Sequence, residues 1–212
     1  MESENKNNFK DTDLDDKNVD EVLATSKGLA DDAEDKSPWY ALKLFGKHLK
    51  DVEKYFNDIP LTTFVPRHYV DYEDRPGHIK TVLRPVVSNL IFVKKSITDK
   101  YLKNVVRLAP YPMFVLRKQN EHRDYYEIPA AEMLQFRMMC DPNLAKSMYL
   151  TSEEAALKVG DPVIVKFGPL KGLSGRLVRQ SKKYYLLKEV PGMGVMLKVS
   201  RWCCRPIEET KS

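Results

Sequence analysis

The chain has 212 residues, of which 42% are hydrophobic and 31% charged, and its formal net charge is +5. This composition is typical of a globular protein, and no stretch has the roughly 18 uncharged apolar residues that a membrane-spanning helix needs. The first thirty residues are acidic and polar and lack the pattern of a secretory signal, so we expect a cytoplasmic protein. The length allows two small domains.

Charge divides the sequence into an acidic tail and a basic body. Residues 1–37 hold 12 acidic and five basic side chains, a net charge of −7, which leaves +12 for the rest. The tail has few large apolar residues and they follow no period, so we expect it to be disordered. A basic body attracts polyanions such as nucleic acid, although solvated lysine-rich faces are also common on ordinary proteins.

The first folded segment begins with a predicted strand over 39–45, WYALKLF, in which apolar residues alternate. Helical spacing of apolar residues follows over 47–59, and Pro60 ends that helix. Residues 61–74 return to an extended pattern, and Pro66 within them indicates an edge position or a bulge. After a turn at 75–77 we expect one long strand over 81–95.

Ser96 is predicted to cap a second helix, whose buried stripe comprises Ile97, Tyr101, Leu102, Val105, Val106 and Leu108. Two short strands follow, around 113–118 and 124–128, and then a helix over 129–139 with Pro129 in its first turn. Residues 38–141 should therefore form one α/β domain with three helices.

Four consecutive apolar residues, Leu90 to Val93, give the long strand two apolar faces. Helices must cover one face. Because only three helices are predicted, we expect the other face to be partly exposed and to bind a partner. The alternative is that a helix or the second domain covers it.

Periodicity is lost over 142–157, which we interpret as a linker with a capping box from Thr151 to Glu154. Residues 158–208 then contain turn signals about every ten residues and five short strands, the pattern of a small SH3-like barrel. Twelve basic and four acidic residues over 158–212 give this part a net charge of +8. The expected fold class is thus α+β, an α/β sandwich with a mixed or antiparallel sheet followed by a small barrel.

No pattern in the sequence indicates catalysis. The four histidines lack metal-ligand spacing, and the glycines at 168, 172 and 175 lie between predicted strands instead of opening a helix around a phosphate. We therefore expect no enzyme activity, no metal and no cofactor. In a barrel this small, the glycines are expected to permit sharp corners.

The order of elements and the stretch VKFGPLKGLSGRLVR resemble the NusG family of transcription elongation factors. RPVVSNLIFV is similar to the segment that runs into an apolar strand in the N-terminal (NGN) domain of that family. Within the family, PVVSNLIFV, EIPAAEMLQF and LKVGDPVIV look closest to the specialised UpxY-type antiterminators of Bacteroidetes. The C-terminal stretch resembles the KOW motif, through Gly168, Pro169, Leu170, Lys171, Gly172, Leu173 and Gly175.

The resemblance implies a monomeric antitermination factor without membrane contact, acting on a polysaccharide operon. It implies that the open sheet face receives the clamp helices of RNA polymerase and thereby disfavours pausing. The residues implied in that contact are Phe45, Val87, Leu90 and Phe92. The residues implied in contacts to non-template DNA, nascent RNA or another partner are Lys43, Arg67, Lys171, Arg176 and Arg179.

In general NusG proteins the barrel recruits Rho or the ribosome, and the partner stays open for this chain. The other function that the sequence supports is a ribosome- or RNA-binding structural protein that uses the same barrel. Binding to core RNA polymerase separates the two hypotheses.

Overall fold

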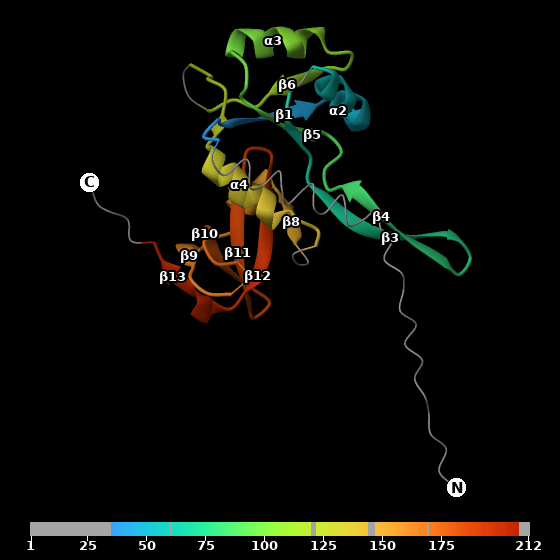
Figure 1. Cartoon of the computed structure of the whole chain (residues 1–212). Coiled ribbons are helices and arrows are strands. Elements are labelled where there is room, and N and C mark those ends of the chain that lie inside the picture. Colours follow the sequence, from blue (N-terminus) through green and yellow to red (C-terminus); the bar gives the residue numbers. More distant parts are fainter. Residues whose placement is uncertain (1–34, 60, 120–121, 144–146, 169, 208–212) are drawn as a thin grey trace.

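A computed structural model of the chain describes residues 35–59, 61–119, 122–143, 147–168 and 170–207 (Figure 1). The fold is α+β and has four layers. Helices α2 and α3 cover one face of a five-stranded sheet, helix α4 lies against its other face, and a six-stranded sheet follows (Figure 1). Most of the predicted tail, 1–37, and Pro169 lie outside the described residues.

The first sheet, here called the N-terminal sheet, is antiparallel with strand order β2-β5-β1-β6, and β7 also pairs with β1. Its strands are β1 (Trp39–Leu44), β2 (Thr63–Phe64), β5 (Leu90–Lys94), β6 (Met113–Val115) and β7 (Glu127–Ile128). The central pair places Ala41 opposite Phe92 and Lys43 opposite Leu90. The predicted strand over 39–45 is confirmed.

Helices α2 (Leu49–Asp58) and α3 (Asp99–Leu108) pack on one face of this sheet. Each contributes a short apolar stripe, because residues three and four apart share a helix face. The cap of α3 is the hydroxyl of Thr98, which accepts from the backbone N–H of Tyr101, so the prediction of Ser96 as cap is wrong. Tyr101 and Leu108, predicted to be buried, are 50% and 68% exposed.

The long strand expected over 81–95 is instead two strands, β4 (His78–Pro85) and β5. Pro85 cannot donate a ladder hydrogen bond, and Ser88 and Asn89 favour a turn, which explains the break. Strand β4 pairs with β3 (Arg67–Arg75) in a separate two-stranded hairpin that projects from the body (Figure 1). The predicted turn at 75–77 is confirmed, with Gly77 at φ 78°.

The six-stranded sheet, here called the C-terminal sheet, is antiparallel with order β13-β9-β10-β11-β12-β8. Its strands are β8 (Met148–Thr151), β9 (Asp161–Val165), β10 (Ser174–Gln180), β11 (Lys183–Val190), β12 (Met193–Val199) and β13 (Cys204–Pro206), with a 3-10 turn η1 (Arg201–Cys203) before the last strand. No closed barrel is found in the described part of the chain, so the sequence-based expectation holds only for the antiparallel strands.

The segment predicted as a linker is ordered over most of its length. It contributes β8 to the C-terminal sheet and forms the short helix α5 (Ser152–Ala156). The predicted capping box is confirmed, because Thr151 Oγ1 accepts from the N–H of Glu154 and the Glu154 carboxylate accepts from the N–H of Thr151. The sequence analysis did not predict β8, because four residues of strand leave too short a pattern to recognise.

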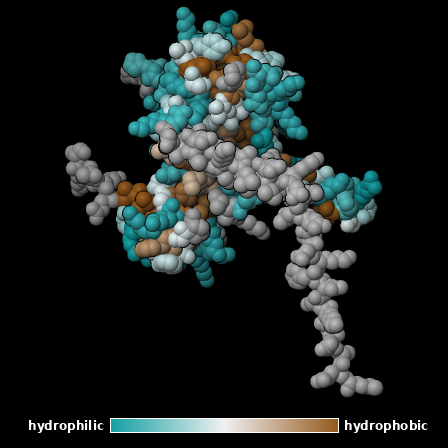
Figure 2. All heavy atoms as spheres, viewed as in Figure 1, coloured by the Kyte–Doolittle hydropathy of each residue, from teal (hydrophilic) through white to brown (hydrophobic). Residues whose placement is uncertain are grey.

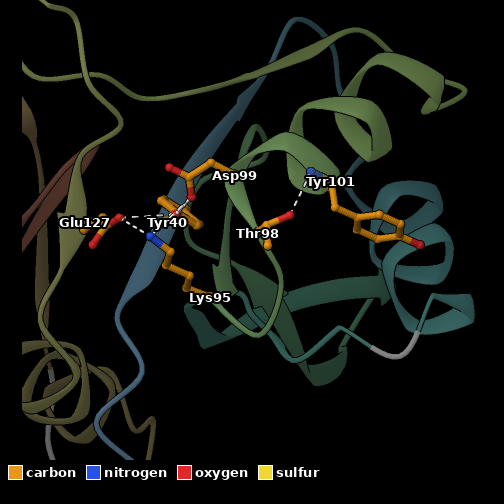
Figure 3. Close-up of polar contacts among 6 residues, drawn as sticks. All are labelled: Tyr40, Lys95, Thr98, Asp99, Tyr101 and Glu127. Atoms are coloured by element: carbon orange, nitrogen blue, oxygen red, sulfur yellow. Dashed lines mark hydrogen bonds and ion pairs between the residues drawn. The ribbon is translucent and has the colours of Figure 1, made fainter.

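A polar network joins the end of β5 to α3 and β7 (Figure 3). The Tyr40 hydroxyl donates to Asp99, the Lys95 ammonium pairs with Glu127, and Lys95 Nζ lies 3.2 Å from Asp99. The Tyr40 hydroxyl holds the pKa of Asp99 below its ordinary value. The hydrogen bond to Glu127, followed by the one to Tyr40, raises the pKa of Lys95 above its ordinary value. The network joins the start of β1 and the end of β5 to α3 and β7.

No described helix is long and apolar enough to cross a membrane.

Candidate functional site

The apolar face predicted to be free is buried. Leu90 is 2% exposed and Phe92 is fully buried, together with Trp39 and Ala41 on β1. The expectation of an exposed sheet face is therefore wrong at these residues. The alternative that the sequence left open, coverage by a helix or by the second domain, is what the structure has.

Two separate parts of the chain cover this face. Helix α4 (Ala130–Met139) places Phe136 against Phe92, with ring centroids 5.5 Å apart. The turn between β11 and β12 lies over Leu90, and a Cβ atom at Gly192 would come within 2.8 Å of Leu90 Cδ1. The resulting hydrophobic core, here called the shared core, runs from β5 through α4 into the C-terminal sheet. The side of β5 that carries Leu90 and Phe92 is here called the shared face.

Helix α4 is joined to the C-terminal sheet by hydrogen bonds. Gln135 Oε1 accepts from the backbone N–H of Ser174 at 3.0 Å, from the Ser174 hydroxyl at 2.9 Å and from Lys188 Nζ at 3.3 Å. Burial lowers the pKa of Lys188, and Glu132 partly offsets this effect. These contacts fix the C-terminal sheet to one side of the helix.

A cleft of about 480 Å³ opens beside the covered face. It lies between the turn before β5 and the β8–α5 segment, and its lining includes Lys43, Val87, Asn89 and Leu90. Val87, predicted as a partner contact, is half-buried there and packs against the shared core. The cleft marks where the two sheets separate.

Beyond the covered region, the same face of the N-terminal sheet stays accessible. Lys43 is opposite both Leu90 and Phe114 across the sheet, and it is exposed. Phe45 is 72% exposed and lies 5.2 Å from Phe114, which is 39% exposed. Phe114 is opposite Lys43 in the sheet, and Phe45, which follows β1, packs against Phe114, so this aromatic pair continues the Leu90 face past its cover.

The five basic candidates fall into two groups. Arg67 forms an ion pair with Glu53 at 2.7 Å, and Arg176 pairs with Glu189 and donates to the Ala155 carbonyl at 2.9 Å. Both guanidinium groups therefore hold the protein's own elements together. Lys43, Lys171 and Arg179 are exposed.

The glycine-rich stretch forms the turn between β9 and β10. Gly168 and Gly172 have φ of 85° and 94°, and a Cβ atom at Gly175 would lie 2.4 Å from the Leu187 carbonyl. Leu173 is buried, Leu170 packs against the shared core, and the Gly172 N–H donates to the Val165 carbonyl. Gly168 and Gly172 thus serve a tight turn and Gly175 allows close strand contact, as the sequence predicted, and Lys171 is exposed in that turn.

Sequence reasoning missed a groove on the C-terminal sheet whose lining combines basic side chains with the aromatic rings of Tyr184 and Trp202. The only signal for it in the sequence was the net charge of +8 over residues 158–212. Trp202 gave no signal because its segment was interpreted as strand, whereas it lies in η1 and is 68% exposed.

The described residues contain no group of three or more histidine, cysteine or acidic side chains placed to hold a metal ion. No family model matches the chain, and no curated protein shows significant similarity to it.

Proposed function

We propose that the chain is a NusG-like antitermination and elongation factor that binds RNA polymerase through the Leu90 and Phe92 face of β5. The observation that carries this proposal is the nature of the cover. Leu90 lies under the turn between β11 and β12 and Phe92 under α4, which is itself hydrogen-bonded to the C-terminal sheet, whereas the helices α2 and α3 take the opposite face. An apolar face covered by a separate sheet can be uncovered without unfolding the sheet to which it belongs.

The arrangement of elements supports both parts of the assignment. An antiparallel sheet with two helices on one face and one on the other is consistent with an NGN-type domain. Five consecutive short strands, a glycine turn after the first and a 3-10 turn before the last support a KOW module of the SH3-like kind. The module assignments rest on these features together with the sequence resemblance.

The proposal requires that polymerase and the C-terminal sheet compete for one face. Polymerase then selects the open form of the chain, and the apparent affinity falls in proportion to the fraction of open molecules. The exposed pair of Phe45 and Phe114 is the part of the face available before opening. No catalytic step is needed, because the factor acts by favouring the elongating state of the enzyme.

A binding assay with purified core RNA polymerase tests the proposal. Phe45→Asp places a charge on an exposed side chain and is expected to weaken binding at least tenfold without affecting stability. Ile79→Asp is the matched control, because Ile79 is 70% exposed but lies on the separate hairpin. Leu90→Ala should also weaken binding. Failure of the wild-type chain to bind, or equal effects of the Phe45 and Ile79 substitutions, would refute the proposal.

The proposed target is a long polysaccharide biosynthesis operon. Transcript sequencing in a deletion strain should show a loss of reads from one operon that grows with distance from its promoter. A loss uniform from the first gene onward would indicate a role in initiation instead.

A further inference from the structure

We propose that the groove on the C-terminal sheet binds a short single-stranded nucleic acid, with phosphates on its basic rim and bases stacked on Tyr184 and Trp202. The groove has a volume of about 1120 Å³ and is lined only by residues between 159 and 206. It therefore belongs entirely to the C-terminal part of the chain. The inference is independent of the polymerase proposal, because no residue of the N-terminal sheet contributes to it.

The rim of the groove is strongly positive. Five exposed cations line it against one carboxylate, that of Asp161. No described carboxylate forms an ion pair with any of the five. A polyanion gains most from cations that the protein has not already neutralised. The five are Arg179, Lys183, Lys198, Arg201 and Arg205.

Two aromatic side chains provide flat surfaces between these charges. The guanidinium groups of Arg179 and Arg201 lie 5.8 and 5.9 Å from the centre of the Tyr184 ring. Trp202 is 68% exposed and stacks at 6.1 Å on Phe167, which is itself 50% exposed. Exposed apolar patches rimmed by polar residues mark interaction or ligand-binding sites.

The tryptophan is held in place by its surroundings. Arg205 Nη1 donates to the Trp202 carbonyl at 3.0 Å and to the Cys204 carbonyl at 3.1 Å, and the Cys203 N–H donates to the Ser200 carbonyl. These bonds fix the 3-10 turn that presents the ring. A turn that is already ordered loses little entropy when a base stacks on the ring that it carries.

This combination favours single strands over the other polyanions. Unpaired bases stack on aromatic rings while phosphates contact the basic groove, and small β-modules bind about 4–16 nucleotides in this way. In a duplex the bases are already stacked on each other, so the rings would gain nothing. An acidic peptide would satisfy the cations but has no repeating flat groups to match both rings.

Fluorescence anisotropy with the full chain and labelled oligonucleotides of about 12 nucleotides tests the inference. The probes are oligouridine, oligothymidine and a duplex of equal length. We expect both single strands to bind more tightly than the duplex, and the difference between the RNA and DNA probes identifies which one the groove prefers. Unlabelled polyglutamate of equal charge should compete poorly.

Trp202→Ala is expected to weaken single-strand binding about tenfold, since one base–aromatic stack contributes roughly 1–3 kcal/mol. Tyr101→Ala is the matched control, because Tyr101 is exposed on α3, far from the groove in sequence. Lys183→Gln should reduce the slope of log affinity against log salt by about 0.7, the value for one phosphate contact on a single strand. Lys50→Gln, exposed on α2, should leave it unchanged.

All of the substituted side chains are exposed, so thermal unfolding curves should match those of the wild-type chain. The inference fails if the duplex binds as tightly as the single strands, if polyglutamate displaces the probe equally well, or if Trp202→Ala binds like the wild-type chain.

Discussion

The two faces of the N-terminal sheet are buried equally well but by different means. On β5, Ile91 and Val93 face α2 and α3, whereas Leu90 and Phe92 face α4 and the C-terminal sheet, and none of the four is more than 2% exposed. Among the described residues, the core on the first face comprises positions between 40 and 125, whereas the second face shares its core with residues up to 204. Burial alone therefore does not separate a permanent core from a docked surface.

The polar contacts beside the two faces also differ in the parts of the chain that they join. The face towards α2 and α3 is bordered by the network of Tyr40, Lys95 and Asp99, which lies within the N-terminal part. Across the shared face, the polar atoms of Gln135 join α4 to the C-terminal sheet. If the two faces have different roles, substitutions on the side of α2 and α3 should unfold the protein. Substitutions on the side of the C-terminal sheet should instead separate that sheet from the N-terminal sheet.

The largest effect is expected at Phe56, which is fully buried between α2 and the sheet. Phe56→Ala should lower the free energy of unfolding by about 3–5 kcal/mol, because the cavity cannot collapse against a sheet. Urea denaturation followed by circular dichroism measures this. Tyr101→Ala, on the exposed side of α3, should change stability by less than about 0.5 kcal/mol.

At the shared face, Gly192→Val is expected to favour the open form, in which the C-terminal sheet has moved away from Leu90. Its Cβ would meet Leu90 at 2.8 Å, and φ at this position is 98°. A cost of about 1–3 kcal/mol corresponds to a 5–150-fold increase in the open population. The buried thiol of Cys140 reports this opening, so its alkylation, followed by peptide mass spectrometry, should accelerate by that factor.

The matched control for this substitution is Gly77→Val. Gly77 has a similar φ of 78° in a hairpin turn, but nothing lies within 4 Å of its Cβ position. A valine at position 77 would therefore have the same backbone strain but would not collide with a neighbouring side chain. Equal alkylation rates of Cys140 in the two variants would show that the Gly192 contact does not hold the sheets together. In the polymerase assay, only Gly192→Val should bind more tightly than wild type.

A smaller effect is expected at Gln135. Gln135→Met removes the acceptor of three hydrogen bonds, at a cost of about 1–2 kcal/mol, and should speed Cys140 alkylation about 5–30-fold. Gln135→Glu keeps the acceptor oxygens and faces Lys188, so it should restore slow alkylation. If Gln135→Met labels at the wild-type rate, these hydrogen bonds do not contribute to docking.

The smallest effect concerns pH. The Tyr40 hydroxyl lowers the pKa of Asp99, so the folded state binds this proton less readily than the unfolded state. The contribution to stability is present at neutral pH and is lost as pH falls from about 5 through the lowered pKa. Asp99→Asn should reduce the fall in the urea midpoint over this range. An unchanged pH profile would mean that the network adds nothing measurable.

Local features of the sequence predicted local structure well. Alternation identified β1, helical spacing identified α2 and α3, Pro129 marked the start of α4, and Thr151 and Glu154 form the expected capping box. The glycines at 168 and 172 adopt positive φ in the expected turn. Predictions failed where neighbours in space decide the outcome, as at the break between β4 and β5 and in the supposed linker, where β8 is a strand only because β12 offers it hydrogen bonds.

The sequence alone determined that both faces of β5 are apolar, because consecutive apolar residues in a strand point to opposite sides, and apolar surface is driven out of water. Only the tertiary structure decided what covers each side. The hydrophobic effect is not directional, so Leu90 and Phe92 are satisfied equally by a helix, a second sheet or a partner, and the choice depends on which surface of complementary shape the rest of the chain brings within reach.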